Sequence, residues 1–199
     1  TGYGAIYFID QMLKTRGQSL DGKRAVVSGS GNVAIYAIEK INEFGGKAVA
    51  CSDSSGFIVD EDGIDLELLK EIKLVRRERI SDYVRLKGER AYYSDQGSVW
   101  EIPCDVAVPS ATQNELNGND AAALIRNGVI AVGEGANMPC TPEAVRLLQQ
   151  ADILFGPAKA ANAGGVATSA LEMQQNASRD SWTFEETEAR LAAIMRRIH

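Results

Sequence analysis

Short apolar runs, rich in β-branched residues, alternate along the chain with longer segments in which apolar residues recur at helical spacing. The runs are RAVVS (24–28), KAVACS (47–52), DVAVPS (105–110), VIAVG (129–133) and DILFG (152–156). Their continuous apolar character is typical of parallel strands that are covered on both faces. The periodicity between them predicts helices at about 3–15, 32–44, 64–73, 119–127, 142–150 and 163–177. The pattern therefore predicts an α/β fold with a doubly wound, mostly parallel sheet and helices on both faces.

A final amphipathic helix is predicted at the end of the chain. Apolar residues recur at helical spacing through 184–198, and acidic residues occupy the first turns of this segment. Ser181 or Thr183 is expected to cap the helix. The stretch GFIVDEDG (56–63) is expected to form a small excursion or hairpin after the second strand, closed by the Asp-Gly pair at its end.

Composition narrows the class of protein. With 199 residues, of which 45% are hydrophobic, the chain is long enough for one well-buried core. Its cysteines, Cys51, Cys104 and Cys140, show no CxxC spacing, so neither a disulfide framework nor a metal site is indicated. The only histidine is the last residue, His199, which argues against imidazole-based catalysis. No signal peptide or long apolar span is visible, so we expect a cytoplasmic protein.

A glycine-rich loop, GSGNVA (29–34), joins the first strand to a helix. In this strand–turn–helix context GxGxxA is typical of a dinucleotide site and of a Rossmann-like fold. Gly29 permits the turn, Gly31 lets the backbone approach a pyrophosphate, and Ala34 keeps the helix close to the strand. The anion would lie on the free N–H groups at the helix N-terminus. The alternative is that the glycines serve only a tight turn, which leaves the acidic Asp53 at the end of the second strand unexplained.

Two signals conflict on the cofactor. Asp53 favours NAD, because an acidic residue at this position commonly accepts hydrogen bonds from the adenosine ribose. The run KLVRRER (73–79), however, places four cations in an otherwise acidic chain of net charge −6, and converging cations suit the 2′-phosphate of NADP. The run could also be an ordinary solvated helix face. A nucleic-acid surface is the weakest interpretation, because the chain is acidic and the run lacks interleaved aromatic residues.

Several longer strings resemble one family. They are TGYG (1–4), GSGNVA (29–34), SDSSG (52–56), PSATQNE (109–115), EGANMP (134–139) and AKAANAGGVATSALEMQQN (158–176). Together they resemble the C-terminal, coenzyme-binding domain of the hexameric NADP-dependent glutamate dehydrogenases. The resemblance implies reversible oxidative deamination, in which L-glutamate, NADP⁺ and water give 2-oxoglutarate, ammonium and NADPH. It also implies a homo-hexamer as the full-length enzyme.

The resemblance also implies roles for individual residues. Cofactor contacts fall on Thr1, Gly29, Ser30, Gly31, Asn32, Val33, Asp53, Ser54, Lys73, Arg76, Arg79, Ala111, Thr112, Gln113 and Asn137, and substrate contacts on Val166 and Ser169. Lys73, Arg76 and Arg79 would clamp the 2′-phosphate, and their spacing of three would place them on one helical face. Val166 would line the side-chain pocket, and Ser169 would contact the γ-carboxylate of glutamate.

Two clusters would meet the middle and the nicotinamide half of the cofactor. Ser30, Asn32 and Val33 would surround the pyrophosphate. The PSATQN loop would lie beside the nicotinamide ribose, and Asn137 would hydrogen-bond the nicotinamide half. Both loops follow predicted strands, where ligands bind in open α/β sheets. The alternative is ordinary loop chemistry, because Asn, Ser, Thr and Gly are also the residues that turns prefer.

The family also has a substrate domain, which supplies the catalytic lysine and aspartate and has no counterpart here. We therefore expect residues 1–199 to be an excised dinucleotide-binding domain whose last helix is truncated. It would contain no catalytic residue of its own and would bind cofactor without turnover. The alternatives are the corresponding domain of an NAD-linked leucine, phenylalanine or valine dehydrogenase, and a non-catalytic NAD(P)-sensing domain.

Overall fold

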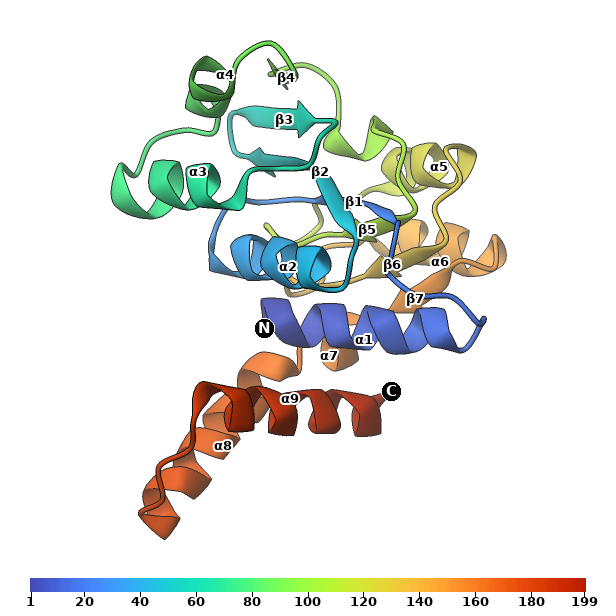
Figure 1. Cartoon of the computed structure of the whole chain (residues 1–199). Helices are drawn as coiled ribbons and strands as arrows, with labels where there is room; N and C mark the ends of the chain where they lie inside the picture. Colours follow the sequence, from blue (N-terminus) through green and yellow to red (C-terminus); the bar gives the residue numbers. More distant parts are fainter.

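A seven-stranded sheet forms the centre of the computed structural model, which describes all residues from 1 to 199 (Figure 1). The strands are β1 (Arg24–Val27), β2 (Lys47–Asp53), β3 (Gly56–Asp60), β4 (Ala91–Ser94), β5 (Val106–Val108), β6 (Ala131–Gly133) and β7 (Leu154–Gly156). Their order is β4-β3-β2-β1-β5-β6-β7, and β3, which pairs antiparallel with both β2 and β4, is the strand that runs against the others. The doubly wound, mostly parallel sheet predicted from the apolar runs is confirmed.

Helices follow most of the strands. They are α1 (Gly2–Lys14), α2 (Asn32–Glu43), α3 (Leu66–Lys70), α4 (Ser81–Lys87), α5 (Gly118–Arg126), α6 (Pro142–Gln150), α7 (Ala158–Ala161), α8 (Gly164–Ser178) and α9 (Phe184–Ile198). A π-helical turn (Glu71–Val75) extends α3, and a 3₁₀ turn (Val99–Glu101) precedes β5. The cap of α9 is Thr183, which forms a reciprocal capping box with Glu186. No helix has the length and apolar character needed to cross a membrane.

The sheet is covered on both faces, as expected. Along β1 the side chains alternate, so that Ala25 and Val27 pack with α1 and α2, whereas Val26 packs with α5 and α6. Figure 1 shows α1 between the sheet and α9, with α8 also beyond α1. At the crossing of α1 and α8, a Cβ atom on Gly4 would lie 2.8 Å from the Cα of Gly164. The two helices therefore touch backbone to backbone.

The antiparallel corner of the sheet was only partly predicted. The expected hairpin is present, because β3 pairs with β2, but Ser54 and Ser55 form its turn rather than the Asp-Gly pair. Gly63, at φ +97°, instead turns the chain out of β3 toward α3. Neither β4 nor α4 was predicted, because both are short and carry exposed apolar residues such as Tyr92 and Leu86.

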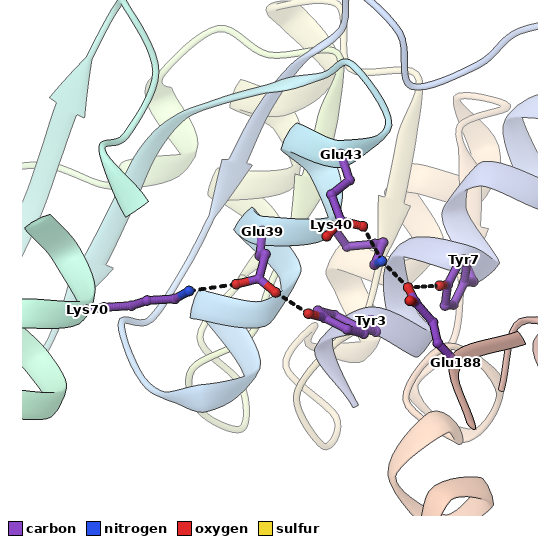
Figure 2. A network of polar contacts seen from close by, with 7 residues as sticks. All are labelled: Tyr3, Tyr7, Glu39, Lys40, Glu43, Lys70 and Glu188. Atoms are coloured by element: carbon purple, nitrogen blue, oxygen red, sulfur yellow. Dashed lines mark hydrogen bonds and ion pairs between the residues drawn. The ribbon is translucent and has the colours of Figure 1, made fainter. Parts of the chain in front are cut away.

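A buried lysine ties α9 to the rest of the fold (Figure 2). Lys40, on α2, is 2% exposed, and its ammonium pairs with Glu43 on the same helix and with Glu188 on α9. The Lys40 Nζ lies 4.3 Å from the ring centroid of Tyr3, and the Tyr7 hydroxyl donates to Glu188. Burial by itself lowers the pKa of Lys40, but the two carboxylates outweigh it and the pKa is raised. The lysine is therefore held in its charged form inside the protein.

Candidate functional site

The carboxyl ends of β1 and β5 define the candidate site. These strands are parallel neighbours, and their chains continue in opposite directions across the sheet, to β2 on one side and β6 on the other. Such a switch point opens a crevice in which α/β proteins bind ligands. A cleft of about 530 Å³ lies there, lined by residues 110–113 after β5, residues 135–137 after β6, Thr1, Val33, Asn162, and residues 165–166 of α8.

The glycine loop leaves the N-terminal end of α2 open. Gly29 has φ +84°, and a Cβ atom there would lie 3.1 Å from the carbonyl oxygen of Ser110, so this turn requires glycine. Gly31 has ordinary backbone angles, and a Cβ atom there would meet no protein atom within 4 Å. Gly31 caps α2 without any side-chain hydrogen bond. The first N–H groups of α2 are therefore free for an anion, and nothing in the protein itself requires the second glycine.

Asp53 is engaged by the protein. Its side chain is 7% exposed, and Oδ1 accepts from the backbone N (2.7 Å) and the hydroxyl (2.5 Å) of Ser55. Oδ2 accepts from the backbone N of Ile80 at 3.1 Å and lies 3.9 Å from the Lys73 ammonium. Burial alone would raise the pKa of Asp53. These hydrogen bonds and the charge of Lys73 together outweigh burial, so the pKa is lowered. The carboxylate fixes the β2–β3 turn and the end of the basic segment.

The expectation of one helical face for the three cations was wrong. The helix ends in the π-helical turn at Val75, and Arg77 has φ +58°, so the chain leaves helical geometry before the last cation. Arg76 forms an ion pair with Glu71, its Nη2 lying 2.6 Å from Oε1. This pairing joins residues five apart, the spacing of a π-helix rather than of an α-helix. The Arg76 side chain thus folds back onto the π-helical turn that precedes it.

The two other cations reach the end of β2. Lys73 donates to the carbonyl oxygen of Glu78 at 2.9 Å, and its ammonium faces Asp53. Arg79 is exposed, and its Nη1 donates to the hydroxyl of Ser54 in the β2–β3 turn. Two cations and a hydroxyl therefore gather next to the carboxylate where adenosine ribose is bound in this type of fold.

An asparagine that sequence reasoning missed orients one that it identified. Asn162, just before α8, donates through Nδ2 to Oδ1 of Asn137 (2.9 Å) and to the carbonyl oxygen of Ala136 (3.2 Å). Both asparagines line the cleft, and this contact leaves the amide nitrogen of Asn137 free to donate. The one signal for Asn162 in the sequence was its polarity within a run of small residues, AANAGG.

A family model described as Glutamate/Leucine/Phenylalanine/Valine dehydrogenase matches residues 1–199. The chain belongs to this dehydrogenase family. It is 56% identical to a glutamate dehydrogenase of Bacteroides thetaiotaomicron and 54% identical to an NADP-specific glutamate dehydrogenase of Escherichia coli K12. Each match covers all of this chain and 45% of the relative. Glutamate dehydrogenase 2 of Plasmodium falciparum superposes with a TM-score of 0.96 at 45% identity, over 100% of this chain and 44% of that one.

This member of the dehydrogenase family thus spans less than half the length of those relatives. Most of the residues predicted from the sequence gather at two neighbouring places. The cleft brings together Thr1, Val33, Ala111, Thr112, Gln113, Asn137 and Val166. Asp53, Ser54, Lys73 and Arg79 meet at the end of β2.

The remaining predicted residues lie at or beyond the rim. Ser30 is buried in the glycine loop, whereas Asn32 is exposed at the start of α2. On α8, Val166 is 76% exposed and lines the cleft. Ser169, one turn further along, is exposed but does not line the cleft. Neither Arg76 nor Ser169 is therefore brought to these two clusters.

Proposed function

We propose that this chain is the NADP(H)-binding, C-terminal part of a glutamate dehydrogenase, which converts L-glutamate, NADP⁺ and water reversibly into 2-oxoglutarate, ammonium and NADPH. The observation that carries the proposal is the continuous edge of binding groups from Ser54 and Arg79, past the open N-terminus of α2, to the cleft at Asn137. Identity above one half with an enzyme named NADP-specific supports the choice of cofactor.

The residues present fit the parts of NADP(H) in order. Arg79, Lys73 and Ser54 would make charge-assisted hydrogen bonds to the 2′-phosphate, and the N–H groups after Gly31 would hold the pyrophosphate. Asn137, held by Asn162, would orient the nicotinamide half. The cofactor supplies the hydride acceptor, and the chain's own residues bind it and fix its position.

Turnover requires substrate and nicotinamide to be held together with water largely excluded. We therefore expect this chain to bind cofactor without turnover. The substrate contacts of Val166 and Ser169 and the assembly into a homo-hexamer stay predictions from the resemblance.

Calorimetric titration of the purified chain with NADPH and NADH, at two salt concentrations, tests the proposal. NADPH is expected to bind more tightly, and its affinity is expected to fall as salt rises, because exposed charges are screened. Equal binding, or a preference for NADH, would contradict the NADP-linked interpretation. That outcome would favour an NAD-linked amino-acid dehydrogenase with Asp53 as the specificity residue.

Gly31→Ala is expected to weaken NADPH binding about tenfold while leaving stability unchanged. The added Cβ atom meets no protein atom, but it would enter the space where the pyrophosphate approaches the backbone. Calorimetry measures the first quantity and urea unfolding the second. Asn42→Ala, at the opposite end of the same helix, is the matched control and should leave both unchanged. Unaltered NADPH affinity in Gly31→Ala would place the pyrophosphate elsewhere.

A further inference from the structure

Glu115 lies behind the loop that follows β5. Its Oε1 accepts hydrogen bonds from the backbone N of Ala111 at 3.0 Å and of Thr112 at 3.3 Å. Those two residues are exposed and line the cleft, whereas Glu115 is half-buried and does not line it. One carboxylate oxygen therefore determines where two successive peptide groups of the cleft wall lie.

The same carboxyl group is coupled to the glycine loop through Ser28. The Ser28 hydroxyl accepts from the backbone N of Ser110 at 2.8 Å, and it also acts on Glu115 as a hydrogen-bonding partner. Burial raises the pKa of Glu115, the Ser28 hydroxyl and the two N–H groups lower it, and the nearby Asp120 raises it, with a net upward shift. A partly desolvated carboxylate forms stronger hydrogen bonds to backbone N–H groups than a solvated one.

We propose that Glu115 is a positioning residue, which holds the peptide groups of Ala111 and Thr112 so that this loop meets the nicotinamide half of the cofactor. The inference rests on the proposed function. Without the carboxylate, two N–H groups would lose their acceptor and the loop would have to find another conformation. Gly29 would keep its hydrogen bond to the Ser52 hydroxyl, and Arg79 its hydrogen bond to Ser54 at the 2′-phosphate corner, because neither contact involves Glu115.

Two ligands separate the two halves of the site. NADPH carries the nicotinamide, whereas adenosine 2′,5′-bisphosphate carries the adenosine and the 2′-phosphate without it. In Glu115→Ala, calorimetry is expected to show NADPH binding weakened about tenfold and bisphosphate binding within about twofold of the unmodified chain. Glu115→Gln keeps a carbonyl oxygen as acceptor, so its affinity for NADPH is expected to lie between those of the unmodified chain and Glu115→Ala. Glu89→Ala, an exposed site outside the cleft, is the matched control and should change neither affinity.

A purely structural role would give a different result. It would weaken both ligands in parallel and lower the midpoint of urea unfolding, and that outcome overturns the inference. Unchanged NADPH affinity in Glu115→Ala overturns it as well. If the unmodified chain binds neither ligand, the proposed function itself fails and the positioning role falls with it.

Nuclear magnetic resonance gives a readout without any cofactor. The amide protons of Ala111 and Thr112 are expected to shift together as Glu115 is protonated, at a pH above the usual range for glutamate. The shifts should be absent in Glu115→Gln. Amide protons that do not titrate with Glu115 would show that the carboxylate does not hold this loop.

Discussion

Lys40→Met is expected to lower the free energy of unfolding by about 3 kcal/mol, because it leaves the carboxylate of Glu188 without its cation among buried groups. This value is at the lower end of the cost of breaking a buried ion pair, because the Glu188 side chain is 23% exposed and its unpaired carboxylate can be partly hydrated. The substitution also removes the cation from above the ring of Tyr3. Urea unfolding followed by circular dichroism measures the change.

Two further variants test the cause. Lys47→Met removes an exposed lysine that forms no ion pair, so it should change stability by no more than about 0.5 kcal/mol. The double variant Lys40→Met with Glu188→Leu is expected to be more stable than Lys40→Met alone, because the less exposed of the two unpaired carboxylates is gone and the one that remains, Glu43, is 52% exposed to water. Equal destabilisation in Lys40→Met and Lys47→Met would show that the buried network of Figure 2 adds no more to the free energy of unfolding than an exposed lysine does.

The loss of stability in Lys40→Met should also depend on pH. Burial raises the pKa of Glu188, but Lys40 and the Tyr7 hydroxyl outweigh it and the pKa is lowered. A lowered pKa means that this stabilisation is complete above the unfolded-state pKa and is lost as pH falls through the folded-state value. As pH falls through these values Glu188 becomes protonated, so the difference in stability between the unmodified chain and Lys40→Met should shrink. A difference that stays constant from pH 7 to pH 3 would contradict the electrostatic origin.

Arg79→Gln is expected to weaken NADPH binding by about 10- to 100-fold while NADH binding changes by less than about twofold. The range corresponds to the loss of one hydrogen bond between charged groups, about 1.5–3 kcal/mol. Arg79 is exposed and already bonds the Ser54 hydroxyl at the end of β2, where only NADP carries a phosphate. Calorimetry with both cofactors at low salt measures the ratio.

The neighbouring arginines make the test specific. Arg77→Gln is the matched control, because Arg77 is exposed and has no partner in the fold. Arg76→Gln should also have a small effect, since Arg76 is paired with Glu71 and directed away from the turn. If all three variants weaken NADPH equally, the effect is a general one of positive charge. If only Arg76→Gln does so, Arg76 rather than Arg79 contacts the 2′-phosphate.

Local signals determined a large part of this fold from the sequence alone. Continuous apolar runs specify buried parallel strands, and GSGNVA (29–34) specifies a strand–turn–helix, because these preferences depend on neighbours along the chain. Position after a strand was likewise sufficient to place 111–113 and Asn137 at one sheet edge, where they line a common cleft. The strings that resemble the dehydrogenases were sufficient to indicate the family, because they extend over most of the chain that the family model matches.

Only the tertiary structure decided which side chains are free to bind a ligand. By residue type and position in the sequence, Asp53 and Arg76 are both candidates for cofactor contacts. In the fold, however, Asp53 already accepts hydrogen bonds from Ser55 and Ile80, and Arg76 is paired with Glu71. Asn162 acts on Asn137, 25 residues earlier in the chain, and the two come close only because separate loops meet. The reason is physical: a charged or polar side chain is satisfied by whichever partner the fold brings within about 3 Å, and spacing along the chain does not specify that partner.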